Sequence, residues 1–417
     1  MSLVGNIEKN AEKVRFHTPG HSGMAKNIGT YDITELSYSD NLLHPQGQIA
    51  ALEQKIASVY KAEACFISTQ GATTSLWEAV FATKDDGDFL LVGKIHSSVY
   101  NALRAFSLRA YHVDELTEET VLPPSVKTAI LTSPDYFGRV LPLEKICARL
   151  RKEGIAVICD SAHGSHFVFS DKLPPMASLF ADLTVCSIHK TLPVATGASL
   201  LLTSKEWAGK CALARKILHS TSPSYVTICS IEQAFADVKG YERAYEEVIF
   251  HVKQFVRSVK KPFSVETNDD PTRLVLTSPF CGEEVAGVLE EAGFVAEMSY
   301  ENKVVFIVTP YNYTHLSALS EAVSCLDVAR FSTFAMREHS FCKHKQPTAL
   351  TFGKKWEEMP LEKAVGRKAY VEAGLYPPGV PLVYAGQSFT EDALSVLAAH
   401  PNNRFGLNGN KVYVIKE

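Results

Sequence analysis

The chain has 417 residues, of which 46% are hydrophobic and 21% are charged, and its formal net charge is -4. The length predicts more than one domain, and the composition is that of a globular protein. The small negative charge gives no electrostatic basis for binding nucleic acid or an anionic membrane. The sequence has no apolar stretch long enough to span a membrane and no signal-peptide core, and its nine cysteines form no CxxC pair, so we expect a cytoplasmic protein.

Short apolar runs alternate with polar turns and amphipathic segments between residues 60 and 205, which is typical of a wound α/β sheet. Strands are predicted at Ala64–Ile67, Phe89–Val92, Ala129–Thr132, Ala156–Cys159 and Ala198–Leu202, and in the run that begins at Leu183. Helices are predicted over Leu76–Phe81 and from Ser97 onward. In each case polar residues follow the strand, where open α/β sheets place their ligands.

The second part of the chain has a different pattern. A helix-rich connector over residues 206–262 precedes strands at Arg273–Leu276 and Val304–Val308. Asn408-Gly409 before Lys411–Ile415 predicts a terminal hairpin. We therefore predict a large α/β domain over residues 1–250 and a smaller carboxyl-terminal α+β domain over residues 251–417.

Two of the predicted strands lead to ionisable residues. Ala156–Cys159 is followed by Asp160, and the run that begins at Leu183 ends at Lys190. A lysine at this edge can form a Schiff base with a carbonyl cofactor, and a buried aspartate can keep a pyridine nitrogen protonated. The pair predicts pyridoxal 5'-phosphate. The alternative is a solvated surface lysine, because most lysines are exposed.

The segment Gly71–Ser75 lies where a strand turns into a helix. Its backbone N–H groups, small side chains and hydroxyls suit the phosphate of the cofactor, although Thr74 or Ser75 could instead only cap the helix. His96 follows the next strand at the same edge of the sheet. It is placed to stack on a pyridine ring and to transfer a proton, but a solitary histidine is more often an ordinary loop residue.

Two pairs of histidines have spacings that bear on metal binding. His163 and His166 form an H-x-x-H pattern, but no third ligand follows at a fitting spacing. His17 and His21 flank a Pro-Gly turn, which argues against a helical zinc pair. We therefore expect no metal.

Five short segments occur in order along nearly the whole chain. They are Phe16–His21, Asp160–His166, Ser187–Lys190, Thr221–Tyr225 and Tyr376–Leu382. Together they resemble the prokaryotic ornithine/lysine/arginine decarboxylase family. The resemblance implies the aspartate-aminotransferase-like fold, which is fold type I of the pyridoxal-phosphate enzymes, with a mostly parallel sheet in the large domain. Because Phe16–His21 comes so early, we expect the short form without an amino-terminal receiver-like domain.

The resemblance also implies a role for each site residue. Lys190 would hold the cofactor, Asp160 would pair with the pyridinium nitrogen, and His96 would stack on the ring with His163 near it. The residues implied around the phosphate are Ala72, Thr73, Ser187 and His189, next to Gly71 of the predicted phosphate segment. Thr221 would contact the phosphate from the partner subunit, which implies a homodimer or an assembly of dimers.

Two departures from the family pattern bear on function. Ala72 stands where a hydroxyl residue is common, which removes one hydrogen bond to the phosphate. Ala385-Gly386-Gln387 replaces the frequent Pro-Gly-Glu, and the missing acid bears on recognition of a basic side chain.

The sequence therefore predicts decarboxylation of a basic amino acid (arginine, lysine or ornithine) to the amine, a reaction of polyamine metabolism. An aminotransferase or a carbon–carbon lyase stays open, because the substrate pocket selects the bond that breaks. A catalytically silent family member is also open; Ala72 and Gln387 favour it, and Lys190 and Asp160 oppose it. The sequence does not decide between the three substrates, or between Lys190 and His96 as the group that reprotonates the substrate carbon.

Overall fold

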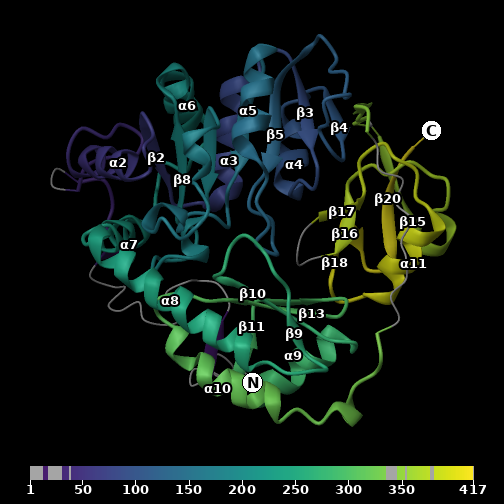
Figure 1. The fold of residues 1–417 in the computed structure, drawn as a ribbon. Helices are drawn as coiled ribbons and strands as arrows, with labels where there is room; N and C mark the ends of the chain where they lie inside the picture. The colour runs from purple at the N-terminus through teal and green to yellow at the C-terminus, as the bar shows by residue number, and fades with distance from the viewer. Residues whose placement is uncertain are drawn as a thin grey trace.

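A computed structural model of the chain describes residues 13–16, 31–36, 39–334, 345–352, 355–375 and 380–416. Figure 1 shows three regions: the large sheet with its helices at the top, a smaller sheet with α9 and α10 below it, and the carboxyl-terminal region in yellow at the right. No helix within these ranges is long and apolar enough to cross a membrane.

The large sheet has eight strands in the order β14-β4-β3-β5-β6-β7-β8-β2. Their bounds are β2 Ala64–Ser68, β3 Asp88–Val92, β4 Ala110–Val113, β5 Val126–Thr132, β6 Ala156–Asp160, β7 Leu183–Cys186, β8 Ser199–Thr203 and β14 Thr348–Ala349. The five central strands from β4 to β7 pair in parallel. Strand β8 is antiparallel to both of its neighbours, and β14 is antiparallel to β4. The predicted mostly parallel sheet is therefore confirmed.

Helices cover both faces of this sheet because side chains alternate along each central strand. Leu91, Ile130 and Ile158 share a core with α3 and α4, while the adjacent Leu90, Leu131 and Val157 share a core with α5. The helices of this part are α2 Gln48–Val59, α3 Gly71–Thr83, α4 Ser97–Ala105, α5 Leu143–Lys152, α6 Lys205–Leu218, α7 Tyr225–Ala234 and α8 Val238–Ser258. Carboxyl ends of the parallel strands consequently meet at one edge of a three-layer unit.

The smaller sheet has the strand order β12-β13-β10-β9. Its strands are β9 Ser264–Val265, β10 Arg273–Thr277, β12 Met298–Tyr300 and β13 Lys303–Ile307, and it is accompanied by α9 Gly282–Glu291 and α10 Leu316–Ser324. A separate parallel pair joins β1 Val14–Phe16 to β11 Phe294–Ala296. Phe16 of β1 is fully buried, and its ring lies 5.7 Å from the ring of Phe306 in β13.

The carboxyl-terminal region contains two three-stranded sheets. Its elements are β15 Trp356–Pro360, β16 Ala373–Leu375, β17 Val380–Val383, α11 Glu391–Ala399, β18 Arg404–Phe405, β19 Leu407–Asn408 and β20 Lys411–Ile415. The predicted hairpin at Asn408-Gly409 is confirmed, since Asn408 pairs with Lys411. An ion pair of 2.9 Å between Arg104 on α4 and the buried Glu372 connects this region to the large-sheet unit.

The predicted strands are all present, and Cys159 and Cys186 are buried as expected. The run from Leu183 is a strand only in its first part, as its change from apolar to polar residues predicts. Strand β7 ends at Cys186, and Ile188–Lys190 forms a single 3-10 turn. This turn places Lys190 just beyond the carboxyl end of the strand.

Candidate active site

Asp160 is the last residue of β6 and is buried among the ends of the central strands. Its Oδ1 accepts a hydrogen bond of 3.1 Å from the Ala162 N–H. Burial raises the pKa of Asp160, and the nearby His96 and Lys190 oppose that rise. A cation bound against this carboxylate would hold it ionised, which is the property that a protonated pyridine nitrogen requires of its partner.

Lys190 faces His163 and Tyr136 across the same edge. Its Nζ lies 2.9 Å from His163 Nε2 and 5.3 Å from the centre of the Tyr136 ring. Burial lowers the pKa of Lys190, Arg273 lowers it further, and Asp160 opposes the change. A larger fraction of neutral amine makes this lysine a better nucleophile. Lys190 is half-buried and its amine contacts His163 and Tyr136, so it is not a freely solvated surface lysine.

His163 is buried behind the lysine. Its ring lies 4.2 Å from the Tyr136 ring, and burial together with Lys190 and Arg273 holds the pKa of His163 well below its usual range. The imidazole is consequently neutral, so its Nε2 can accept a hydrogen bond from the Lys190 amine. This arrangement orients the amine without adding a second positive charge.

His96 forms the N-cap of α4. Its Nδ1 accepts a hydrogen bond of 3.2 Å from the Ser98 N–H, so the neutral ring carries its proton on Nε2. Burial lowers the pKa of His96, and the carboxylate of Asp160 opposes this. His96 therefore has both a local capping role and a proton available on its other ring nitrogen.

Helix α3 begins at Gly71, as the phosphate-binding prediction requires. Gly71 has φ +80°, in the region that favours glycine, and its N–H donates to the Gly197 carbonyl at 2.7 Å. The next N–H groups, of Ala72 and Thr73, belong to the first helical turn and have no intrahelical acceptor. The capping alternative is wrong: the N-cap is Gln70, the Thr74 hydroxyl donates back to the Gln70 carbonyl, and Ser75 bonds Ser199.

Ser187 and His189 approach the same corner from β7. Their Oγ and Nδ1 atoms are 3.3 Å apart, and His189 Nδ1 donates to the Ala198 carbonyl at 3.1 Å. Burial lowers the pKa of His189. Because Gly71 bonds Gly197 and His189 bonds Ala198, one short turn holds the helix start and the lysine turn together.

Thr221 is exposed in a turn that is held against the phosphate segment of its own chain. The Ser220 N–H donates to Gln70 Oε1 at 2.9 Å, and the Ser224 N–H donates to Thr69 Oγ1 at 3.3 Å. Contact with a partner subunit stays a prediction. Most of the segment Phe16–His21 (residues 17–21) and the first part of the segment Tyr376–Leu382 (residues 376–379) lie outside the described residues.

Three residues near Lys190 were missed at the sequence level: Tyr136, Arg273 and Glu297. Tyr136 follows the end of β5, so its place after a strand was an available signal. Arg273 begins β10, and Glu297 lies between β11 and β12, where its charge opposes the lowering of the Lys190 pKa. No local pattern marks these last two, because they come from the smaller sheet.

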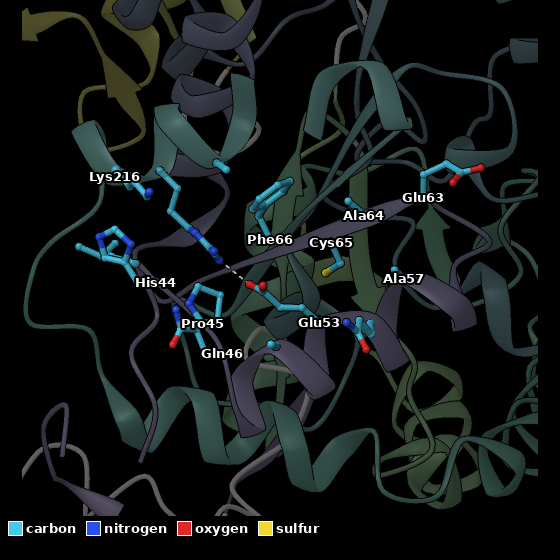
Figure 2. Close-up of a pocket in the computed structure, with 15 residues that line it drawn as sticks. His44, Pro45, Gln46, Glu53, Ala57, Glu63, Ala64, Cys65, Phe66 and Lys216 are labelled. Carbon is cyan, nitrogen blue, oxygen red and sulfur yellow. Dashed lines mark hydrogen bonds and ion pairs between the residues drawn. The ribbon is translucent and has the colours of Figure 1, made fainter. Parts of the chain in front are cut away.

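A cavity of about 450 Å³ lies apart from these residues, between α2, α6 and the first half of β2 (Figure 2). Figure 2 shows Glu53, Cys65 and Phe66 lining it, with His44 and Lys216 at one side. Glu53 forms a buried ion pair with Arg215, and its carboxylate also accepts a 2.9 Å hydrogen bond from the Ile67 N–H. The cavity contains none of the predicted site residues.

The residues at the sheet edge fit the requirements of pyridoxal phosphate. They supply an amine of lowered pKa, a buried carboxylate, a ring histidine and a helix N-terminus for an anion. The fold and this set of residues define the class: a fold type I structure of the pyridoxal-phosphate enzymes.

A family model described as "Orn/Lys/Arg decarboxylase, major domain" matches residues 8–110 and 106–277, and the chain belongs to this family. An uncharacterised protein, YaaO, of Bacillus subtilis is 27% identical, over 98% of this chain and 95% of the relative. An arginine decarboxylase of the same organism is 25% identical, over 95% of this chain and 92% of the relative. The solved structure of lysine decarboxylase A from Pseudomonas aeruginosa has a TM-score of 0.75 at 18% identity, covering 93% of this chain and 74% of that one.

Proposed function

We propose that this protein is a pyridoxal-phosphate-dependent decarboxylase that converts arginine, lysine or ornithine to the corresponding amine and carbon dioxide. The observation that carries the proposal is the contact of 2.9 Å between Lys190 and a neutral His163, beside the buried Asp160. Family membership and the relatives that are named arginine decarboxylase support the reaction class. We also propose that residues 1–250 form the cofactor-binding domain, and that the enzyme acts in cytoplasmic polyamine metabolism.

The residues of this chain divide the work of holding the cofactor and moving protons. Lys190 would hold pyridoxal phosphate, Asp160 would keep its ring nitrogen protonated by charge, and the N–H groups of Ala72 and Thr73 would bind its phosphate. When bound, this cofactor withdraws electrons from the bond that breaks. His96, with a proton on Nε2, and the Lys190 amine are the two groups placed to return a proton to the substrate carbon.

Recognition of a basic side chain requires an acid near the site. Asp160 and Glu297 are the two acids whose charge raises the pKa of Lys190. Because Asp160 is assigned to the ring nitrogen, we assign the cationic end of the substrate to Glu297. Gln387, which stands where the family often has an acid, accepts a hydrogen bond of 3.2 Å from the Tyr384 N–H through its side-chain oxygen.

A panel of amino acids tests the function directly. We expect release of carbon dioxide from arginine, lysine or ornithine with one amine formed per carbon dioxide, and little release from leucine or glutamate. Formation of a keto acid instead would identify an aminotransferase, and fragments that retain the carboxylate would identify a carbon–carbon lyase. A protein that binds the cofactor but turns over none of the three basic amino acids would contradict the proposal.

We further propose that the working unit is a homodimer or an assembly of dimers in which Thr221 reaches the partner's phosphate. A two-fold interface uses one surface twice and so completes two sites at once. Thr221→Val should reduce kcat/KM by about tenfold, the loss expected from one charge-assisted hydrogen bond. Mixing inactive Lys190→Ala with a Thr221 variant that is itself inactive should restore part of the activity after subunit exchange. A fully active monomer in sedimentation would contradict this arrangement.

A further inference from the structure

A buried polar cluster lies behind the site, on the segment that leads into β10. At its centre is Asp270, which is fully buried. Its Oδ1 accepts hydrogen bonds from the Thr272 N–H at 2.9 Å and from the Thr272 hydroxyl at 2.7 Å, and it lies 3.2 Å from His166 Nε2. The neighbouring Arg273 is also buried, and two of its three guanidinium nitrogens have no partner among the described residues. Burying charged groups lowers the stability of the fold unless each is paired and hydrogen-bonded.

This cluster reaches the site along two routes. The direct route is Arg273, whose Nη2 lies 3.5 Å from the His163 carbonyl oxygen. The second route runs from His166 through Tyr245, whose rings are stacked at 5.4 Å, to the Thr191 carbonyl, which accepts a bond of 3.2 Å from the Tyr245 hydroxyl. The two routes therefore end on His163 and on the residue after Lys190.

The same segment also holds the turn that carries Tyr136. The Gly138 carbonyl accepts hydrogen bonds from the N–H groups of Asp269 and Asp270, at 3.1 and 2.9 Å. Asn268 Nδ2 donates to the Phe137 carbonyl at 2.7 Å. A Cβ at Gly138, which has φ +81°, would lie 2.8 Å from Arg273 Cβ, so the close approach requires glycine. Tyr136 in turn contacts both His163 and Lys190.

We propose that Asp270 is a positioning residue of the active site: from the smaller-sheet side it holds the His163–Lys190 contact in place through His166, Thr272 and Arg273, and it balances the charge of Arg273. Its role in the reaction rests on the proposed function, but its effect on Lys190 does not. None of these four residues needs to touch the substrate.

The charges of Asp270 and Arg273 predict the direction in which the pKa of Lys190 should shift when either is removed. Burial alone would raise the pKa of Asp270, but His166 and Arg273 outweigh it and the pKa is lowered, so the group is an anion. Arg273 lowers the pKa of both Lys190 and His163. Removing the Asp270 charge leaves Arg273 unbalanced and should therefore lower the proton affinity of Lys190 further. The other charged groups that act on Lys190, Asp160 and Glu297, stay unchanged in this comparison.

The test measures the proton affinity of Lys190 in the full-length protein prepared without cofactor. Trace acetic anhydride labels neutral amines, and peptide mass spectrometry across pH 6–11 (roughly the range in which lysines titrate) gives the labelling midpoint of each lysine. Asp270→Asn should move the Lys190 midpoint down by about 0.5–1 pH unit, and Arg273→Met should move it up by a similar amount. The double variant should return close to the parent value, while the midpoint of Lys216, which lines the distant cavity, should stay fixed in all of them.

Asp269→Asn is the matched control, because Asp269 is exposed and lies on the same segment but its side chain bonds the Val140 N–H. A loss of local structure would shift this control as well as Asp270→Asn. Equal shifts in the two aspartate variants, or unchanged Lys190 midpoints in Asp270→Asn and Arg273→Met, would overturn the proposal. If Asp270→Asn fails to fold, the upward shift in Arg273→Met decides alone. A correct pattern of shifts in a protein that decarboxylates no basic amino acid would overturn only the proposed function.

Discussion

Charged side chains are buried near both ends of β2, but their partners differ between the two ends. At its amino-terminal end, beside the cavity, Glu53 and Arg215 form a direct ion pair, and the Arg215 guanidinium lies 5.0 Å from the centre of the Phe66 ring. Past its carboxyl-terminal end, around the phosphate segment and Lys190, no ion pair within 4.0 Å joins Lys190 or Asp160 to another described residue. The first region pairs its opposite charges directly, whereas Lys190 and Asp160 have hydrogen-bond partners but no ion-pair partner among the described residues.

This difference separates a structural charge from a chemical one. A buried pair that is satisfied internally has no need of a ligand, however much space lies next to it. A buried carboxylate and an amine that are held apart can each be completed by a bound molecule, which is why perturbed ionisable groups gather at functional sites. The cavity of about 450 Å³ therefore does not identify the site, whereas the neighbouring groups of Lys190 do.

The largest expected effect is that of Lys190→Ala. It removes the group that holds the cofactor and should reduce turnover by roughly 10⁴-fold or more, with little effect on thermal stability because the half-buried lysine at the sheet edge contributes little to the core. Lys216→Ala, at the cavity, is the matched control and should retain activity. The comparison is read from carbon dioxide release and from borohydride trapping of cofactor on the peptide that contains residue 190. Normal turnover by Lys190→Ala would refute the assignment.

Asp160→Asn should have the next largest effect, because a neutral amide cannot hold a ring-nitrogen proton by charge. We expect kcat to fall by about 10²–10⁴-fold while the cofactor still binds, and Asp160→Glu to lose less because it keeps the charge. Cofactor retention is measured by visible absorbance after gel filtration. Parental activity in the asparagine variant would show that the carboxylate has no catalytic role.

Changes at the cavity should have the opposite profile. Arg215→Met leaves Glu53 buried without its cation and should reduce the free energy of unfolding by about 3 kcal/mol, while activity per folded molecule stays unchanged. The double variant Glu53→Gln with Arg215→Met should recover most of that loss, because no charge is left unpaired. Urea denaturation measures both. A loss of activity in the double variant at full stability would make the cavity part of the functional site.

Local pattern predicted much of this structure because the central strands carry their signals within a few residues. Asp160 and Lys190 could be assigned from the ends of two apolar runs, and Gly71 from the change of strand to helix. The resemblance supplied the roles of Ser187 and His189, which no spacing had indicated. The end of β7 before Ile188 also agrees with the change from apolar to polar residues at Ser187.

The remainder depended on contacts between distant segments. His166 meets Asp270 across 104 positions, and Arg104 meets Glu372 across 268. Strand β14 joins the large sheet from residues 348–349, far along the chain from the rest of that sheet. Such pairings are set by tertiary packing, since no local periodicity specifies which turn of one sheet reaches the edge of another.

The last expected effect concerns Glu78, which lies on α3 between the two regions. Both of its carboxylate oxygens are buried with no partner among the described residues, and burial raises the pKa of Glu78 to about 8 from a reference of 4.5. If the charge of Arg215 acts mainly on Glu53, it lowers the pKa of Glu78 only a little. Glu78 then stays protonated in the folded state at neutral pH.

Between pH 4.5 and about 8 the unfolded chain has then lost a proton that the folded chain keeps. The stabilisation that comes from the Glu78 proton is fully present below pH 4.5. It decreases as the pH rises toward about 8, by about 1.4 kcal/mol for each pH unit at most. Glu78→Gln has no proton to lose, so its free energy of unfolding relative to the parent should rise steadily from pH 5 to pH 8 in urea denaturation. Glu144→Gln, at an exposed position on α5, should show no such slope. A constant difference between Glu78→Gln and the parent would mean that Glu78 is ionised in the fold, and that Arg215 serves two carboxylates instead of one.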